Sequence, residues 1–381
     1  MQILHIALAI GLLAGNGLAQ RHKLAAVNSE SPDGKLIQQS LQETDPAKKV
    51  AILEQFIAQF ADKKEATAWV LSQLQPLYLK VGNNDKAIET GDKLLALDAD
   101  DIDASYNNLK AAEAKKDADA IIKWSAHTSQ IARKVAASPK REGEDGEEWK
   151  HAVDYAKQVD TYTEYALYLA ALQSPDPQKV MLLSDTLEKR NPDSQYIALV
   201  MERYAASARQ ANALPKAVEF GERAYARKQF SADMLLAMSD YSMQKQQFDK
   251  ALTYSTKAVE VINSQPKPEG LADADWEKKK ASIIGLGHWM SGVTLSNQSK
   301  YAPSDKALRT ALPYIKDNQH LMAGALFHLG LVNYKMGQTS KNKTQINDAL
   351  KFSQQCSAIN GPFQAQAQKN VKVIKTEFKI P

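Results

Sequence analysis

Pairs of helix-forming segments recur along this chain with a period close to 34 residues. In the stretch LKVGNNDKAIETGDKLLALDADD, one helix pattern ends at Gly82, a polar turn follows, and a second helix pattern carries a small residue at Ala87. The same pattern returns at Ala217 and again at Ala251, which lie 34 residues apart. A fixed period of this length indicates a repeat array, in which each helix pair buries its apolar stripe against its neighbours.

The small residue of the second helix can be followed through most of the chain, and it marks the predicted crossing of the two helices of a pair. Its successive positions are Val50, Ala87, Ala120, Val180, Ala217, Ala251, Ala307 and Ala349. Most of the intervals between them are close to one repeat, which predicts about eight repeats over residues 45–362. The apolar spacing of residues 363–381, with lysines on the other face, predicts a C-terminal capping helix.

Composition agrees with a fold made of helices. The chain has 381 residues, of which only 17 are Gly and 14 are Pro, and good helix formers such as Ala, Leu, Lys, Gln and Glu are abundant. Alternating runs of Val, Ile and Thr are missing, so strands have little support. The 48 basic residues nearly balance the 44 acidic ones, which gives no electrostatic footprint for nucleic acid.

The segment GALFHLGLVNYKMG adds a Leu-Gly pair at Leu329 and Gly330, followed by Tyr334 and Gly337. Together with the small residues above, this pattern resembles the tetratricopeptide repeat, and the chain as a whole resembles exported bacterial proteins of that family. The resemblance implies an all-α, right-handed superhelical solenoid of antiparallel helix pairs. It also implies a concave groove, lined by the first helix of each pair, that binds other proteins.

Two intervals in the array are too long for one repeat and too short for two. They contain the related stretches PKREGEDGEEW, from Pro139 to Trp149, and PKPEGLADADW, from Pro266 to Trp276. We interpret them as helix hairpins with overlong arms, which form insertions at about 136–150 and 262–277. Each Trp is expected to pack back on its own hairpin as a hydrophobic staple; an exposed Trp that binds a partner is the alternative.

The N-terminus, MQILHIALAIGLLAGNGLAQ, has a short apolar core followed by a small-x-small site. This pattern predicts a signal peptide over residues 1–19, cleaved after Ala19, and hence an exported protein located in the periplasm or outside the cell. Residues 20–44 then form an N-terminal segment before the array, and no membrane span is expected after signal removal. An uncleaved anchor or a buried N-terminal helix is the alternative.

The sequence shows no motif of an enzyme, a cofactor site or a metal site. It lacks the HExxH zinc pattern, the phosphate-binding P-loop and the GxSxG nucleophile elbow. Its seven histidines show no ligand spacing, and its single cysteine, Cys356, falls at a small-residue position that predicts burial. We therefore expect no catalytic residues, no cofactor and no metal.

Binding of a protein or peptide is the chemistry that the resemblance implies. Carried over by position, the residues of the predicted groove are Tyr162, Tyr165, Glu202, Arg203, Arg209, Asp240, Trp289, His328, Tyr334 and Lys335. The family's Asn and Lys clamp for a terminal carboxylate does not transfer, because these positions carry Tyr, Arg and Asp instead. The aromatic residues could equally belong to the core.

The function expected from these observations is a non-enzymatic scaffold of the cell envelope that holds a peptide or helix in its groove. Three alternatives remain open at this point. They are a structural subunit of an envelope assembly, an enzyme with an unrecognised site, and a carrier of a small molecule.

Overall fold

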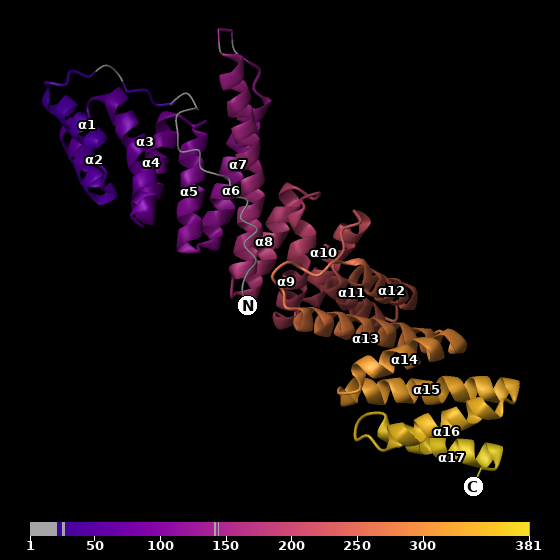
Figure 1. The fold of residues 1–381 in the computed structure, drawn as a ribbon. Coiled ribbons are helices and arrows are strands. Elements are labelled where there is room, and N and C mark those ends of the chain that lie inside the picture. Colours follow the sequence, from indigo (N-terminus) through magenta and orange to yellow (C-terminus); the bar gives the residue numbers. More distant parts are fainter. Residues whose placement is uncertain (1–20, 25–26, 141, 144, 381) are drawn as a thin grey trace. The chain divides into compact units, whose positions relative to one another are not determined.

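The computed structural model describes residues 21–24, 27–140, 142–143 and 145–380, and in these ranges the chain forms seventeen helices and no strand. The predicted signal peptide and its cleavage site lie outside the described residues. The expectation of an all-α fold built from antiparallel helix pairs is confirmed (Figure 1). The chain divides into two compact units, and the boundary falls between Tyr196 and Ile197.

The N-terminal unit, described from residue 21 to 196, contains four helix pairs. They are α1 (Pro32–Gln42) with α2 (Pro46–Phe60), α3 (Lys64–Lys80) with α4 (Asn84–Leu97), α5 (Ile102–Lys115) with α6 (Ala118–Ala137), and α7 (Gly146–Gln173) with α8 (Pro177–Arg190). Each helix packs on the next one in the chain, and the first helices α3, α5 and α7 also pack on one another. This second kind of contact stacks the pairs side by side.

The C-terminal unit, described from residue 197 to 380, continues the pattern. Its helices are α9 (Tyr196–Gln210), which begins at the unit boundary, α10 (Leu214–Ala226), α11 (Ala232–Gln244), α12 (Phe248–Ser264), α13 (Asp273–Asn297), α14 (Tyr301–Ile315), α15 (Gln319–Ser340), α16 (Lys343–Ser357) and α17 (Gln364–Phe378). The first helices α11, α13 and α15 contact one another, and α17 packs on α16 and α15 at the end of the unit.

Short polar side chains start many of the second helices. Asn83, Asp117, Asp176 and Asn342 each accept a hydrogen bond from a backbone N–H in the first turn of the helix that follows. These bonds satisfy amide groups that have no partner inside the helix, which fixes where the helix begins. The turn between the two helices of a pair is therefore encoded locally.

The predicted crossing residues are mostly buried, with two corrections. Ala87, Val180, Ala217 and Ala251 are fully buried at the fourth position of their helices. Val50 and Ala349 are also buried, but they lie at the fifth position of α2 and the seventh position of α16. Ala120 and Ala307 are only half-buried. In those two helices Ile121 and Ser304 hold the buried fourth position, so a larger or a polar side chain replaces the small residue that the repeat pattern favours.

Gly292 shows why a small residue is needed where helices meet closely. A Cβ atom added at this position would lie 2.5 Å from Leu308 Cγ and 3.1 Å from the backbone nitrogen of Leu308. Such contacts are closer than van der Waals packing tolerates. Gly292 is therefore a packing residue that lets α13 and α14 approach each other closely.

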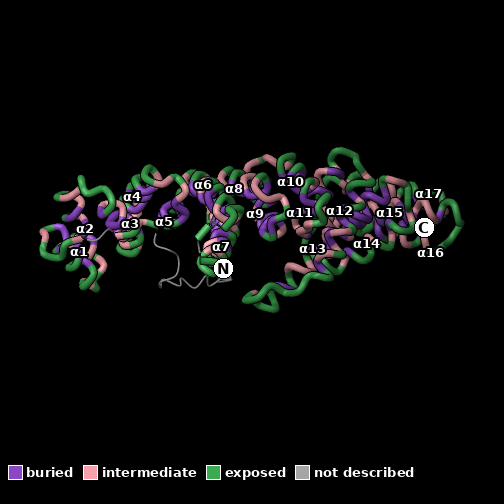
Figure 2. The backbone as a smooth tube through the Cα atoms, turned by 90° about the horizontal axis from the view of Figure 1, so that it is seen from above, coloured by how far each residue is buried: buried purple, intermediate pink, exposed green. Residues whose placement is uncertain are grey.

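The related Trp stretches join α6 to α7 and α12 to α13. In both loops the glycine at the same offset, Gly143 or Gly270, has a positive φ, at 80° and 76° respectively, which glycine adopts without strain. The loop residues around them are exposed (Figure 2). The two hairpins therefore share a local geometry as well as a sequence.

The two tryptophans of these hairpins differ in burial. Trp276 is 6% exposed, as expected for a staple. Trp149 is half-buried, and its Nε1 donates a hydrogen bond of 3.1 Å to the carbonyl oxygen of Ser138 at the end of α6. The expectation of a mostly buried Trp is thus correct for Trp276 and only partly correct for Trp149.

Candidate partner-binding site

A row of tyrosine rings crosses the first helices of the N-terminal unit. The tyrosine row consists of Tyr106 on α5, Tyr162, Tyr165 and Tyr168 on α7, and Tyr196 at the start of α9. The ring centroids of Tyr106 and Tyr162 are 5.3 Å apart, those of Tyr162 and Tyr165 are 5.8 Å apart, and those of Tyr165 and Tyr196 are 5.8 Å apart. Tyr168 stacks on Tyr196 at 5.1 Å.

The spacing of the three tyrosines on α7 explains the course of the row. Residues three apart on a helix are turned by about 60° relative to each other. Tyr162 therefore meets α5, Tyr165 follows it around the helix, and Tyr168 reaches Tyr196. Tyr196 is buried, whereas the other four rings of the row are half-buried.

Tyr162 is held by two charged residues of α5. Its hydroxyl donates to both carboxylate oxygens of Glu113 at 2.9 Å, and Lys110 Nζ lies 3.8 Å from its ring centroid and contacts the hydroxyl. Lys110 also pairs with Glu113 at 3.7 Å. Tyr162 is thereby fixed in position, and the two charges largely compensate each other.

Burial changes the proton affinity of this cluster. It raises the pKa of the Glu113 carboxyl above its usual range, although Lys110 acts in the opposite direction, and it lowers the pKa of Lys110. Burial, with smaller contributions from Glu113 and Asp103, raises the pKa of Tyr106 to about 12. Burial likewise raises the pKa of Tyr162 and of Tyr168, so both hydroxyls remain protonated donors at neutral pH.

Two hydroxyls of the row differ from that of Tyr162. Within the part of the chain that the structure describes, the hydroxyls of Tyr165 and Tyr168 make no hydrogen bond to protein. Their rings are held by neighbouring rings, but their donors are available. A bound molecule with acceptor atoms could satisfy them.

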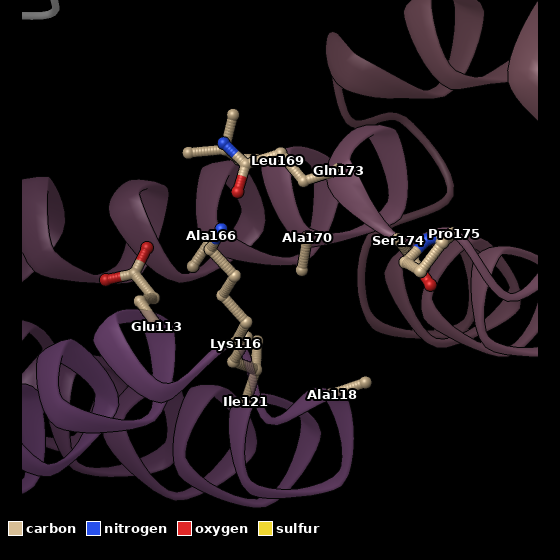
Figure 3. Close-up of a pocket in the computed structure, with 10 residues that line it drawn as sticks. All are labelled: Glu113, Lys116, Ala118, Ile121, Ala166, Leu169, Ala170, Gln173, Ser174 and Pro175. Carbon is tan, nitrogen blue, oxygen red and sulfur yellow. The ribbon is translucent and has the colours of Figure 1, made fainter.

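An open hollow lies next to the row, between the end of α5, the start of α6 and the last part of α7 (Figure 3). Its lining residues are Glu113, Lys116, Ala118, Ile121, Ala166, Leu169, Ala170, Gln173, Ser174 and Pro175. Glu113 lines the hollow and also forms, with Lys110, the Lys110–Glu113 clamp that holds Tyr162. The hollow and the tyrosine row therefore form one surface. Apolar side chains supply much of the wall, and Lys116 adds a positive charge.

The structure places the ten predicted groove residues in several separate settings. It brings Tyr162 and Tyr165 together in the tyrosine row. Tyr334 and Lys335 also lie together, but Tyr334 donates to Glu377 of α17 and packs on Phe378, which ties it to the capping helix.

Other predicted groove residues are engaged within the C-terminal unit. Glu202 is exposed and pairs with Lys279 of α13. Trp289 Nε1 donates to the carbonyl oxygen of Leu321 at 2.9 Å. His328 Nδ1 lies 2.9 Å from Ser296 Oγ, and burial lowers the pKa of His328 to about 4.

The remaining predicted positions lie on α9 and α11. Arg203 is half-buried and Arg209 is exposed near the end of α9. Asp240 is half-buried and accepts a hydrogen bond of 3.2 Å from Gln244 one turn away.

Sequence reasoning missed most of the surface around Tyr162. Tyr106, Lys110 and Glu113 follow one another at helical spacing on one face of α5, which is a signal that the sequence contains. The partner of that face, however, is the first helix of the next repeat, more than forty residues away. Identifying it requires the alignment of neighbouring repeats, which the long α6–α7 hairpin obscures.

Several simpler expectations can be compared with the structure here. Cys356 is fully buried, its Sγ lies 3.4 Å from the carbonyl oxygen of Ala323, and burial raises the pKa of its thiol to about 11. This confirms the interpretation of Cys356 as a packing residue. In the described ranges no helix is both long and apolar enough to cross a membrane, and no cluster of three metal-ligating side chains occurs there.

Comparison of the sequence with known proteins identifies no relative. No family model matches the chain, and no curated protein matches it. Among solved structures, the chain is similar to the P58(IPK) TPR domain, with 11% identity over 92% of this chain and 99% of that chain and a TM-score of 0.26. It is similar to yeast Tom70 with 10% identity over 93% of this chain and 97% of that chain and a TM-score of 0.23.

With TM-scores this low, the fold is established from the chain's own helices and their contacts. The described residues form antiparallel pairs with capped turns, buried crossing residues and contacts between successive first helices. These are the features by which a helical-repeat array buries a continuous core. The chain therefore has an all-α, tetratricopeptide-like fold.

Proposed function

We propose that this chain is a non-enzymatic scaffold that binds a segment of another protein on the tyrosine row and the adjoining hollow. The observation that carries the proposal is the combination of half-buried aromatic rings, two hydroxyls without a protein partner among the described residues, and an open hollow beside Tyr162. Helical-repeat proteins commonly use such extended surfaces for binding.

The chemistry of the row suits recognition of a protein. Tyrosine supplies a large contact area with only two rotatable side-chain bonds, so little conformational entropy is lost on binding. Here the rings are already held by one another and by the Lys110–Glu113 clamp. A pre-organised aromatic surface next to a hollow is the usual setting of the residues that contribute most to affinity.

A selection from a displayed library of random peptides tests this proposal. The bait is the chain from Gln20 to Pro381, and the variants are Tyr165→Ala and, as a control, Tyr314→Ala. Tyr314 lies on α14 and is 46% exposed, so its loss removes an exposed tyrosine away from the row. Thermal unfolding of each variant is recorded beside the selection.

We expect peptides that bind the wild type and the Tyr314→Ala variant but not a folded Tyr165→Ala variant. Binders that are indifferent to Tyr165 would contradict the proposed surface. If Tyr165→Ala unfolds, Tyr168→Phe replaces it, since this change removes a hydroxyl and leaves the stacked ring.

We also propose that the protein is exported and begins at Gln20 after cleavage. The apolar core and small-x-small site of the first nineteen residues support this. Arg21 and His22, directly after the site, contact Asp98 and Asp101, so the new N-terminus would start at residues attached to the folded unit. Mass spectrometry of the protein from its own host should show Gln20 first, and an intact Met1 would overturn the proposal.

A further inference from the structure

We infer that the tyrosine row binds a proline-rich segment in the polyproline II conformation, with an acidic residue of that segment at the hollow. This inference rests on the proposed function and names the class of ligand. It follows from three properties of the surface, which are its shape, its free hydrogen-bond donors and its charge.

The first property is the shape of the surface, which decides the kind of peptide backbone that it can bind. An extended strand would need an open sheet edge, and the described residues contain no sheet. An amphipathic helix would need a continuous apolar groove, whereas this row carries hydroxyls and the charges of Lys110 and Glu113. A row of aromatic rings is instead the setting in which polyproline II segments bind.

The second property is the set of donors that lack a partner. A polyproline II segment has no internal hydrogen bonds, so its carbonyl oxygens are free acceptors, and its prolines have no N–H group to satisfy. The hydroxyls of Tyr165 and Tyr168 are donors without a protein partner in the described structure. The donors of the row and the acceptors of such a ligand are therefore complementary.

The spacing of the row is compatible with the same ligand. Neighbouring ring centroids in the row are 5.1 to 6.2 Å apart. Two residues of polyproline II rise by roughly 6 Å. An extended proline-rich segment that crosses α5, α7 and the start of α9 would thus meet a new ring about every second residue.

The third property is the unbalanced charge at the hollow. Glu113 is compensated by Lys110 and by the hydroxyl of Tyr162. Asp117, next to Lys116 in the chain, is engaged at the start of α6, where it accepts from the backbone of Asp119 and Ala120. Lys116 has no ion-pair partner among the described residues, so of the two charged side chains that line the hollow its ammonium is the one available to a ligand.

The acidic residue of the ligand is assigned to this charge. A carboxylate placed at the hollow would approach the Lys116 ammonium while the neighbouring prolines cover the tyrosine rings. Complementary charge of this kind sets the register and direction of a bound segment. A lysine in the same place would be repelled.

Fluorescence anisotropy with defined peptides tests the inference. The probe is a labelled peptide of the sequence Pro-Pro-Glu-Pro-Pro-Glu-Pro-Pro. Its two controls replace every Glu with Lys, or every Pro with Ala. The protein variants are Lys116→Asn and Lys228→Asn, because both lysines are exposed and have a left-handed backbone, with φ of 55° and 60°, that asparagine tolerates.

We expect saturable binding of the acidic proline peptide and weaker binding of both control peptides. Lys116→Asn should weaken the acidic peptide by about fivefold, the factor that corresponds to one exposed ion pair, and should reduce the preference for Glu over Lys. Lys228→Asn should change neither. The unfolding midpoints of both variants should match that of the wild type.

Three results would overturn the inference. They are no binding of the acidic proline peptide, equal binding of the alanine control, and a Glu preference that survives Lys116→Asn. If any of these occurs while the library selection still yields peptides that depend on Tyr165, the proposed function stands and only the ligand class is wrong.

Discussion

The first helices of the N-terminal unit leave polar groups open to a ligand, whereas those of the C-terminal unit bind their own chain. In the N-terminal unit the hydroxyls of Tyr165 and Tyr168 have no protein partner in the described structure. In the C-terminal unit Lys279 of α13 pairs with Glu202 of α9 and, at 3.2 Å, with Asp233 of α11. Polar groups on the first helices are thus available for binding in one unit and already paired within the chain in the other.

The long hairpin of the C-terminal unit produces this difference. The extra N-terminal turns of α13 carry Lys279 across to α9 and α11, and Trp276, three residues earlier, is buried. In the N-terminal unit the first half of α7 contacts α5 through Tyr155 and α6 through Asp160, and the hydroxyls of Tyr165 and Tyr168 have no partner among the described residues. The lesson is that the same insertion can either cover a binding face or leave it open.

The largest expected effect on stability comes from Trp276, the buried tryptophan at the start of α13. Trp276→Ala should lower the free energy of unfolding by about 3 kcal/mol or more, because it empties a buried site. Trp149→Ala should cost less, about 1–2 kcal/mol, because Trp149 is half-buried and makes one hydrogen bond. Denaturant unfolding of both variants measures the difference, and equal losses would break the comparison between the two hairpins.

Acid should weaken the C-terminal unit through His328. Its pKa of about 4 in the folded chain lies below its ordinary value of 6.5, so the unfolded chain binds a proton first as the pH falls. The contribution of His328 is therefore unchanged above pH 6.5 and turns unfavourable as the pH falls towards 4, by up to about 3 kcal/mol.

A His328→Gln variant isolates the contribution of His328 to the pH dependence of the free energy of unfolding. Glutamine removes the titrating group and can still bond to Ser296. The stability of the variant should fall less between pH 6.5 and 4 than that of the wild type, in denaturant unfolding at each pH. Parallel curves would show that His328 does not couple protonation to folding.

Trp289 should act as a packing residue and not as a binding residue. Its ring lies against Gly324, and its Nε1 donates to Leu321. Trp289→Ala should cost about 2 kcal/mol, less than a fully buried tryptophan, and should leave peptide binding at the tyrosine row unchanged. A loss of binding at constant stability would restore Trp289 as part of the binding surface.

The smallest effect is expected for Lys279. Its ion pairs with Glu202 and Asp233 are partly exposed, so Lys279→Met should change the free energy of unfolding by about 1 kcal/mol or less, and less at high salt. The informative readout is binding. If Lys279→Met binds peptides more tightly than the wild type does, and these peptides contact α9 and α11, then the N-terminal turns of α13 cover a second binding site.

Much of the fold follows from the sequence because its determinants are local. The turns at Asn83, Asp117 and Asp176, the helix-forming composition and the buried residues at Ala217 and Ala251 all act within one repeat. Ala120 and Ala307 do not hold the crossing position, because the buried fourth positions, Ile121 and Ser304, lack the small apolar side chain that the pattern selects.

The candidate site could be predicted only in part because it depends on contacts between repeats. Tyr162 and Tyr165 stand out by their spacing on one helix. Their partners Tyr106, Glu113 and Tyr196 come from other helices. The long α6–α7 hairpin sets the number of residues between the two partners on α5 and the tyrosines of α7. Sequence position likewise could not show that Glu202 is paired with Lys279.

Tyrosine footprinting by mass spectrometry tests the central claim, that the open first-helix face of the N-terminal unit is the binding surface. The wild-type chain is labelled at its tyrosines with and without a peptide from the library selection. We predict that the peptide protects Tyr165 and Tyr168 and leaves the labelling of the exposed Tyr314 unchanged. Protection confined to tyrosines of the C-terminal unit, with Tyr165 and Tyr168 labelled as in the free chain, would contradict the account.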